Sequence, residues 1–550
     1  MDPMAPDTEV SATEAALPPS SPPGGQGLAS AALLMIIVTL VSRIAGMIQI
    51  IVIAAIFGTK GDINSFWAAF TIPDLLYFLM AGGAARTAFI PVFTEYLARG
   101  KTKEAWRVFS SVFFLLTILG GTIVLAGTVF APQIARVSAM GWLGSEPGRV
   151  DVCAHIMRIL FPAQLFLVIG GLLMGTLNAF KHFLWPAVGP IVYDAFFILG
   201  AVAAGVCISR GMSQQQALDV MAGAVVLGAL CGNVLIQIPP LAKRGAKLQA
   251  VLDLHDEGVR RVIRLALPVI LGLAISEINW VVVRILATLC ESDAQSILAY
   301  ANRLWKLPSG LFAAAIAIAV FPSLSEHYAR KDEEAYRRDF SFAMRNTLFL
   351  VLPVTVAFGV LATPIVRMLY QRHSFSADTS PIVGNVLIWL TPGMFALALN
   401  YILARAFYAR HNTVTPVLAG VISFVVCVGV GWWGAVRMGV VGLALATSAS
   451  AVVNAGLLLI WLKQQVGRLD GTRILVSTLK MLPGCVALGA VCWWGSAHLA
   501  ARLGTTRELA KLLTVMVPLG LGGLAFVACC AVLRTEELSS AWRLVFRRGR

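Results

Sequence analysis

The sequence predicts an all-α polytopic membrane protein. Of its 550 residues, 58% are hydrophobic and only 13% are charged, and the mean hydropathy is +0.80. Apolar runs of about 20 residues recur from Leu28 to Arg534, and each can cross a ~30 Å hydrocarbon core. Lipid offers no partners to backbone N–H and C=O groups, so these runs are expected to be helices.

An internal repeat divides the runs into two halves. Four identities recur at a constant shift of 231 residues: Pro91 with Pro322, Glu95 with Glu326, Ala98 with Ala329 and Arg99 with Arg330. A second pair of segments, Leu177–Val192 and Phe407–Ile422, aligns at a shift of 230. A repeat of this length in a membrane chain is typical of a two-lobed transporter.

We predict about fourteen spans in this order: 28–57, 64–93, 106–131, 153–178, 184–208, 217–241, 263–288, 296–325, 341–367, 381–408, 413–436, 440–462, 474–497 and 510–534. The first six form an N-terminal lobe, 28–241, and the next six form a C-terminal lobe, 263–462. A basic cytoplasmic linker, 242–262, joins the lobes. Two extra transmembrane helices, 474–534, follow them.

The net charge of +15 is distributed as a topology signal. The segments after even-numbered spans carry 21 Lys and Arg residues, and those after odd-numbered spans carry 8. The positive-inside rule therefore places the segments after even-numbered spans, and both termini, in the cytoplasm. We expect membrane lipids, and no nucleic acid, as partners of these charges.

The two ends of the chain are predicted to be cytoplasmic tails. Residues 1–27 are rich in Pro, Ser and Ala and contain no Lys or Arg. They lack the basic start of a signal peptide, so we predict a disordered tail. Residues 535–550 form a basic tail.

No metal, cofactor or nucleotide site is predicted. The nine cysteines are dispersed without a C-x-x-C pair, as expected of small packing residues. The seven histidines are dispersed as well, and no phosphate-binding loop of the ATPase type occurs. We therefore expect neither cofactors nor catalytic residues.

Charged residues inside the first lobe are the first site candidates. Arg43 follows Ser42 near the middle of the first span, where an arginine costs about 2.5–3.5 kcal/mol on insertion scales. It could face a polar cavity, or it could snorkel or pair helices. Gly46 permits close helix approach or a bend. Asp194 is either a helix-to-helix hydrogen-bond partner or a functional group.

The second span contains Pro73 and the pair Gly82-Gly83, which predict a broken or bent helix. Asp74 and Arg86 could each line a cavity. They lie twelve positions apart, or ~18 Å along a helix, so we expect no direct pair between them.

The second lobe supplies further cations. Glu277 and Arg284 lie two turns apart on one helix face, ~10 Å from each other, so each should meet another partner or a shared cavity. Arg303 and Lys306 lie at i and i+3 beside a Pro-Ser-Gly bend, with Asn302 next to them. Two such cations suit a multivalent anion such as a pyrophosphate, and the alternative is anchoring at the membrane interface.

Several motifs carry a resemblance to a known family. They include S-R-x-x-G at Ser42–Gly46, F-x-x-A-F-x-x-P-x-L-L at Phe66–Leu76, Y-A-x-R-L-x-x-L-P-S-G-L-F at Tyr300–Phe312, F-P-S-L-S at Phe321–Ser325 and F-Y-A-R at Phe407–Arg410. From about Ser30 to Arg548 the chain resembles the MurJ (MviN) family. That family belongs to a superfamily with multidrug/toxin exporters and polysaccharide flippases.

The resemblance implies a flippase that moves lipid II, the undecaprenyl-pyrophosphate-linked peptidoglycan precursor, across the bacterial plasma (inner) membrane. It implies two six-helix lobes around a central cationic cavity, and two helices that offer a groove for the lipid tail. Arg43 and Arg303 match two of the family's cavity arginines. The substrate-binding candidates are Ser42, Arg43, Asn64, Asp74, Arg86, Glu277, Arg284, Asn302, Arg303 and Lys306.

Other family positions have lost their charge, acids and bases together: Gln49, Ile50, Asn64, Tyr77, Phe78, Gly82, Val283, Asn302 and Asn412. The leading hypothesis is a lipid II flippase that works by alternating access without chemical catalysis or sodium coupling. The alternatives are a flippase for another lipid-linked oligosaccharide or related polyprenyl-pyrophosphate lipid, and a drug/cation antiporter that uses Asp74, Asp194 or Glu277. A scaffold that binds lipid II or a division partner is a fourth hypothesis.

Overall fold

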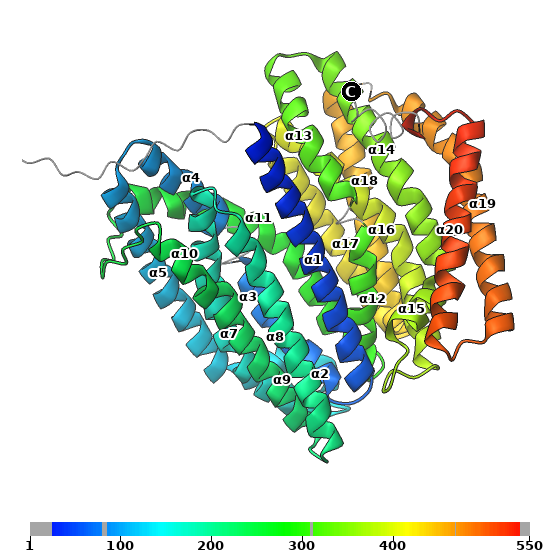
Figure 1. Ribbon diagram of the computed structural model, residues 1–550, viewed down its shortest axis with the longest axis horizontal. Coiled ribbons are helices and arrows are strands. Elements are labelled where there is room, and N and C mark those ends of the chain that lie inside the picture. The colour runs from blue at the N-terminus through cyan, green and yellow to red at the C-terminus, as the bar shows by residue number, and fades with distance from the viewer. Residues whose placement is uncertain (1–24, 80–84, 309–311, 468, 539–550) are drawn as a thin grey trace, which may run out of the picture.

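The computed structural model describes residues 25–79, 85–308, 312–467 and 469–538, which form helices and no strands (Figure 1). Eleven helices in these ranges are long and apolar enough to cross a membrane. Three predicted spans, 64–93, 263–288 and 296–325, are not among the eleven. The prediction of an all-helical membrane fold is therefore confirmed, whereas the number fourteen stays a prediction.

The N-terminal lobe precedes the linker. Its elements are α1 (Gly25–Phe57), α2 (Ile63–Ala69), α3 (Thr71–Tyr77), α4 (Ala85–Ala98), α5 (Thr102–Val129), α6 (Ala131–Ser138), a 3-10 turn (Met140–Trp142), α7 (Pro147–Ala179), α8 (Leu184–Ser209), α9 (Gln214–Gly228), a π-helical turn (Ala229–Val234), a second 3-10 turn (Leu235–Gln237) and α10 (Ile238–Ala242). The Ser213 capping box fixes the start of α9, because side chains satisfy its first backbone N–H groups.

The C-terminal lobe consists of α11 (Glu257–Ala287), α12 (Ala294–Pro308), α13 (Ala314–Ala329), α14 (Glu333–Val360), α15 (Ala362–Tyr370), α16 (Thr379–Ala409), α17 (Val414–Met438) and α18 (Val440–Val466). Helix ends recur between the lobes with the spacing of the sequence motifs. Helix α5 runs from 102 to 129 and α14 from 333 to 360, so both their starts and their ends are 231 residues apart.

Two predicted spans contain more than one helix. The span 64–93 overlaps α2, α3 and α4, with a break at Phe70. The span 296–325 overlaps α12 and α13, and residues 309–311 between them lie outside the described part. Pro73 lies inside α3 rather than at the break, while Gly82-Gly83 fall outside the described residues. The ninth span was predicted to reach residue 367. That end is wrong, because α14 stops at Val360 and a separate amphipathic helix, α15, begins at Ala362.

Helix α11 joins the two lobes. It begins at Glu257 because Asp256 caps its first N–H groups, so its first turns lie within the predicted linker 242–262. Its first turns pack Val259 and Val262 into a core cluster of the N-terminal lobe. Farther along, Leu286 packs in a cluster shared by both lobes.

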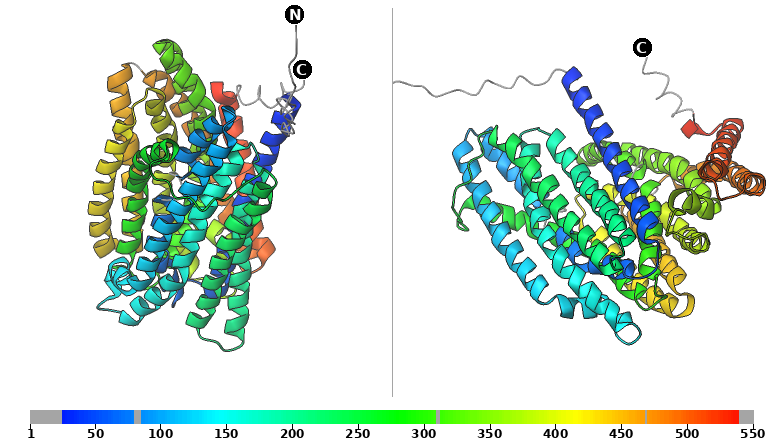
Figure 2. Two further views of the ribbon diagram at one scale, coloured as in Figure 1. Left: turned by 90° about the vertical axis from the view of Figure 1, so that its left-hand side faces the viewer. Right: turned by 60° about the horizontal axis from the view of Figure 1, so that its bottom comes forward.

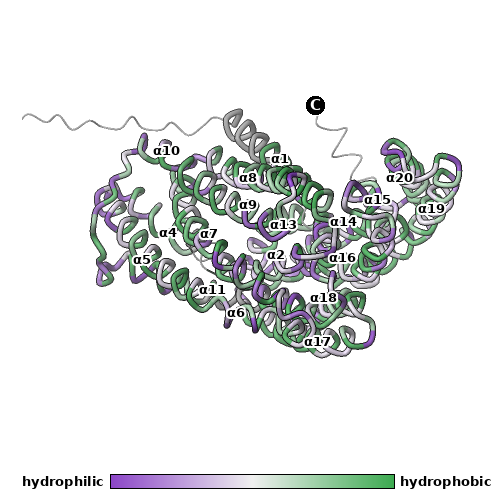
Figure 3. The backbone as a smooth tube through the Cα atoms, turned by 90° about the horizontal axis from the view of Figure 1, so that it is seen from below, coloured by the Kyte–Doolittle hydropathy of each residue, from purple (hydrophilic) through white to green (hydrophobic). Residues whose placement is uncertain are grey.

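The helices α19 (Gly471–Leu503) and α20 (Glu508–Val532) form an antiparallel hairpin outside the lobes, beside α14 and α15 (Figure 2). Viewed from below, hydrophobic residues colour most of both lobes and the hairpin (Figure 3). The described start of α1 and the end of α20 lie on the same upper face (Figure 1). The sequence predicts that this face is cytoplasmic. Residues 25–27, predicted as part of the tail, already belong to α1, and residues 1–24 and 539–550 lie outside the described part.

Candidate substrate cavity

Where α1 ends and α2 begins, at the lower end of Figure 1, the lobes are held together by buried hydrogen bonds, here called the lower seal (Thr59, Asn64, Ser296 and Tyr300). The Asn64 side-chain oxygen accepts from the backbone N–H of Ser296 at 3.0 Å and from its hydroxyl at 2.7 Å. The Asn64 amide donates to the Thr59 carbonyl at 2.7 Å. The Tyr300 hydroxyl donates to the Gly58 carbonyl at 2.6 Å. The segment from Gly58 to Asn64 of one lobe is thus hydrogen-bonded to α12 of the other lobe without a buried charge.

Above the lower seal lies the cationic cavity, which has a volume of 290 Å³ and contains side chains from both lobes. Helices α1 and α8 contribute from one lobe and α12 from the other. The residues that line it are Ser42, Arg43, Asp194, Arg303, Lys306 and Leu307. Three cations and a single carboxylate line this cavity, so its charge favours an anion.

A glycine allows the lobes to come together at this cavity. A Cβ atom on Gly46 of α1 would collide with the terminal nitrogen of Arg303 and lie 3.6 Å from Oδ2 of Asp194. The Arg303 guanidinium therefore lies against the backbone of α1, close to the Asp194 carboxylate. Gly46, predicted to permit close helix approach or a bend, thus leaves room for a side chain of α12.

Charged and aromatic groups extend the cavity toward α3 and α11. Arg284 is 7% exposed at its side chain, and its Nη1 lies 3.6 Å from Oδ2 of Asp74, whose side chain is 44% exposed. The Trp280 ring is 5.0 Å from the Lys306 ammonium and 5.9 Å from the Arg284 guanidinium carbon. Lys306 is within electrostatic range of Glu277 and Arg303. One network therefore includes charges from α1, α3, α8, α11 and α12.

An apolar pocket of 440 Å³ adjoins the cationic cavity. It lies between α1, α12, α14 and α20 and is lined by Leu40, Arg43, Ile44, Met47, Leu307, Pro308, Phe312, Val354, Ala357, Phe358 and Leu519. Arg43 and Leu307 line both spaces. The site is thus amphipathic, with cations on one side of this boundary and hydrocarbon on the other.

Within the described ranges, no group of three or more His, Cys, Asp or Glu side chains could hold a metal. The nine cysteines are free thiols, buried or half-buried among the helices. The chemistry that this site offers is recognition of charge and of hydrocarbon.

The comparisons with known proteins now decide the family. Residues 53–514 match the model of the family described as "Lipid II flippase MurJ". The chain belongs to the MurJ family. A "Probable lipid II flippase MurJ" of Vibrio cholerae is 28% identical over 510 residues, covering 92% of this chain and 96% of that protein. A "Lipid II flippase MurJ" of Burkholderia cenocepacia is 27% identical over 431 residues, covering 78% and 82%.

Solved structures share the fold. A lipid II flippase MurJ in an inward closed conformation aligns with a TM-score of 0.73 at 22% identity, over 91% of this chain and 98% of that one. An inward-facing multidrug resistance MATE family transporter of the MOP superfamily aligns with a TM-score of 0.66 at 15% identity, over 80% and 99%. The helices and the MurJ family together indicate a multi-pass protein of the bacterial inner membrane.

Of the predicted site residues, the structure brings most together. Ser42, Arg43, Arg303 and Lys306 line the cationic cavity, and Asp74, Glu277 and Arg284 lie in the adjoining network. Asn64 does not line the cavity, because it is fully buried in the lower seal. Asn302 is not among the lining residues, and its side-chain oxygen is buried. The side chain of Arg86 falls outside the described residues.

Two groups were not predicted as site residues. Trp280 was overlooked because a tryptophan in an apolar span usually packs in the core or at the membrane interface. Asp194 was left open, although a carboxylate well inside a span was the available signal. The pairing of Asp74 with Arg284 joins segments 210 positions apart, and nothing in their spacing indicates it.

Proposed function

We propose that this chain moves lipid II across the inner membrane by alternating access, without chemical catalysis. The carrying observation is the boundary at Arg43 and Leu307, where a cationic cavity meets an apolar pocket. A polyprenyl pyrophosphate has the same two parts, an anionic headgroup and a long hydrocarbon tail. This proposal gives each part of the lipid a matching surface.

In this proposal the pyrophosphate binds between Arg43, Arg303 and Lys306. Arginine presents a planar fork of N–H donors that suits phosphate oxygens, and lysine adds a compact charge. Because Arg43 belongs to one lobe and the other two cations to α12 of the other lobe, a bound pyrophosphate would hold the lobes together. The adjoining network of Asp74, Arg284 and Trp280 holds Lys306 on the side away from the bound pyrophosphate.

The polyprenyl tail would occupy the apolar pocket and continue into lipid. Moving the headgroup without a protein lining would place unpaired charge in hydrocarbon, which costs several kcal/mol. The lower seal closes the predicted outer end, so the headgroup would enter from the cytoplasmic side, where both termini lie in this proposal. Opening the seal while the upper end closes completes the transfer.

The cavity supports a lipid-linked anion more than a cationic drug. Each acid of the cavity and of the adjoining network lies within electrostatic range of a cation: Asp74 of Arg284, Asp194 of Arg303 and Glu277 of Lys306. A cationic cargo would have to compete with these cations. The contacts described above recognise pyrophosphate and tail and say little about the sugar, so another lipid-linked oligosaccharide is the second candidate.

The test is the accessibility of lipid II at the outer face of cells depleted of their own flippase and supplied with this chain. We expect wild type to restore accessibility, and Arg43→Ala and Arg303→Ala to reduce it by more than tenfold, the loss expected for a hydrogen bond between charged groups. Arg437→Ala, an exposed cation at the end of α17, is the matched control and should behave as wild type.

Three results would contradict the proposal. If the well-expressed wild type restores nothing while a different lipid-linked sugar reaches the outer face, the substrate is that lipid. If lipid II binds to the purified chain but never reaches the outer face, the scaffold hypothesis holds. If dye efflux is found that survives Arg43→Ala and fails with Asp194→Asn, the antiporter hypothesis holds.

A further inference from the structure

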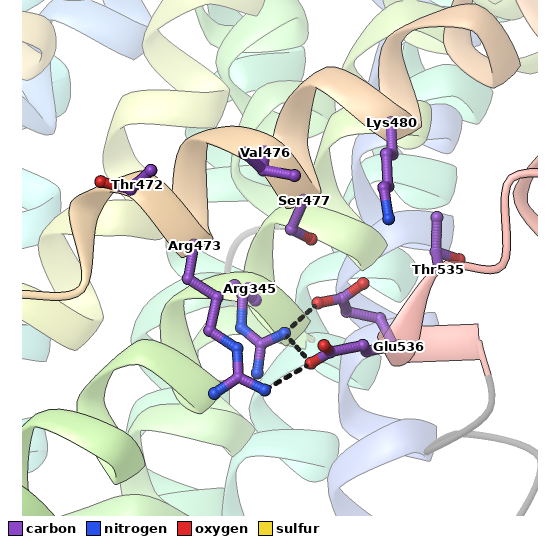
Figure 4. Close-up of a pocket in the computed structure, with 9 residues that line it drawn as sticks. Arg345, Thr472, Arg473, Val476, Ser477, Lys480, Thr535 and Glu536 are labelled. Atoms are coloured by element: carbon purple, nitrogen blue, oxygen red, sulfur yellow. Dashed lines mark hydrogen bonds and ion pairs between the residues drawn. The ribbon is translucent and has the colours of Figure 1, made fainter.

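A second polar pocket lies far from the cationic cavity, at the upper end of the α19–α20 hairpin (Figure 4). This hairpin pocket has a volume of 340 Å³ and is lined by Arg345 of α14, by Thr472, Arg473, Val476, Ser477 and Lys480 of α19, and by Thr535, Glu536 and Glu537 after α20. It shares no residue with the cationic cavity or the apolar pocket. Its position is at the predicted cytoplasmic edge of the membrane.

Ion pairs form the floor of the hairpin pocket. Arg345 Nη1 lies 2.7 Å from Glu536 Oε2 and 2.8 Å from Glu537 Oε1, and Arg473 Nη2 lies 3.0 Å from Glu536 Oε2. Arg345 and Glu537 are 7% and 2% exposed, so the contact between them is buried, whereas the side chains of Arg473 and Glu536 are more than half exposed. The lining has three cations and two carboxylates, which leaves one positive charge unbalanced.

Ser477 and Lys480 also line the pocket and take no part in these ion pairs. Arg473, Ser477 and Lys480 lie at i, i+4 and i+7, on one face of α19. Ser477 is 7% exposed, yet among the described residues its hydroxyl has no hydrogen-bond partner. Figure 4 shows this hydroxyl and the Lys480 ammonium directed toward the same hollow. A buried hydroxyl without a partner is rare in folded proteins and indicates a missing ligand or water.

We propose that the hairpin pocket binds the phosphate of an anionic phospholipid headgroup through Lys480, Arg473 and the Ser477 hydroxyl. A phosphate supplies the acceptor oxygens that these donors require. The two Glu side chains hold Arg345 and Arg473 in place beside the phosphate.

The surroundings select a lipid over a free phosphate. Val476 and Leu479, exposed by 45% and 52%, lie on the flank of α19 next to Lys480, and exposed Pro483 continues this flank toward the membrane interior. Acyl chains attached to a phosphate at Lys480 would lie along these residues. Such a lipid would fasten the hairpin to the inner leaflet, independently of what the cationic cavity carries.

The test uses the full-length chain in detergent, titrated with short-chain phosphatidylglycerol, and follows both the Tm and the number of lipids retained in native mass spectrometry. We expect wild type to retain one lipid and to gain Tm, because a ligand of the folded state stabilises it. Lys480→Ala should weaken binding by about tenfold or more. Arg502→Ala, an exposed cation at the other end of α19, is the control and should bind as wild type.

Ser477→Ala separates a ligand role from a structural one. A donor for a ligand should lose lipid binding while the lipid-free Tm stays unchanged or rises, because an unpartnered buried hydroxyl is removed. A fall of the lipid-free Tm with unchanged lipid binding would overturn the proposal. Inorganic phosphate matching the effect of the lipid would overturn the lipid source, and equal losses in Lys480→Ala and Arg502→Ala would overturn the site.

Discussion

The two regions where the lobes meet use different chemistry. The lower seal is made of neutral groups that are fully buried and bonded to one another, such as Asn64 with Ser296. The cationic cavity, within the next two turns of α12, contains Arg43, Arg303 and Lys306 around an open space. Neutral hydrogen bonds contribute about 0.5–1.5 kcal/mol each, so the seal can be broken and remade at modest cost. Clustered cations instead need an anion to bring them together.

The largest free-energy change is expected from Asn64→Ala, which removes hydrogen bonds of the lower seal. Removing this amide leaves the buried Ser296 N–H without its acceptor and breaks the bonds of Asn64 to the Ser296 hydroxyl and the Thr59 carbonyl, so we expect a loss of about 2–4 kcal/mol from the closed end. Spin labels at Met212 and Ala377, in a background with the native cysteines replaced, should report a longer distance between the lobes. Ser145→Ala, an exposed hydroxyl in the described loop before α7, is the control.

An unchanged label distance in Asn64→Ala would show that other contacts hold the lobes at this end. The backbone bond from Ser374 N–H to the Ala55 carbonyl, at 2.9 Å, would then be the next group to examine.

A smaller effect is expected at the cavity from Gly46→Ala. The added methyl group displaces the Arg303 guanidinium, so we expect transport to fall by roughly tenfold through a weakened charge-assisted hydrogen bond. Thermal stability should hardly change, because the displaced atoms end a flexible side chain and Ala favours the helix by about 0.5–1 kcal/mol. Outer-face lipid II accessibility and Tm measure the two quantities.

Gly121→Ala on α5, where a Cβ atom meets open space, provides the matched control for Gly46→Ala. Normal transport in both variants would mean that the position of Arg303 against α1 is unimportant for the anion.

The smallest effect is expected from Asp293→Asn, at the rim of the seal. Its carboxylate accepts a long 3.4 Å bond from the Thr59 hydroxyl, and an amide oxygen can accept the same bond. We expect a change below about 0.5 kcal/mol in unfolding free energy, as for partly exposed charges. A large change in Tm would show that the charge of Asp293 also stabilises the lower seal. The seal would then not differ from the cavity in being held by neutral groups.

The sequence allowed the helical fold to be predicted for physical reasons, and it singled out Arg43, Arg303 and Lys306, which the structure places around one cavity. Hydropathy reveals apolar spans, and a buried arginine such as Arg43 is costly enough to indicate a cavity. Hydropathy does not reveal where a helix stops, and the break at Phe70 contains neither Gly nor Pro. It also cannot separate Asn64 from a cavity residue, because a polar side chain satisfied by Ser296 reads the same as one that faces solvent.

Helix α12 has one further consequence. Its 15 residues carry Ser296 and Tyr300 of the seal and, within the next two turns, Arg303 and Lys306 of the cavity. One helix therefore carries residues of the lower seal toward one end and cations of the cavity toward the other. Rotating α12 about its axis by about 20° would move the tip of an arginine side chain by roughly 3 Å, one hydrogen-bond length. The residues of the lower seal on α12 would rotate by the same angle. Anion binding in the cavity and opening of the lower seal would then be coupled directly through α12.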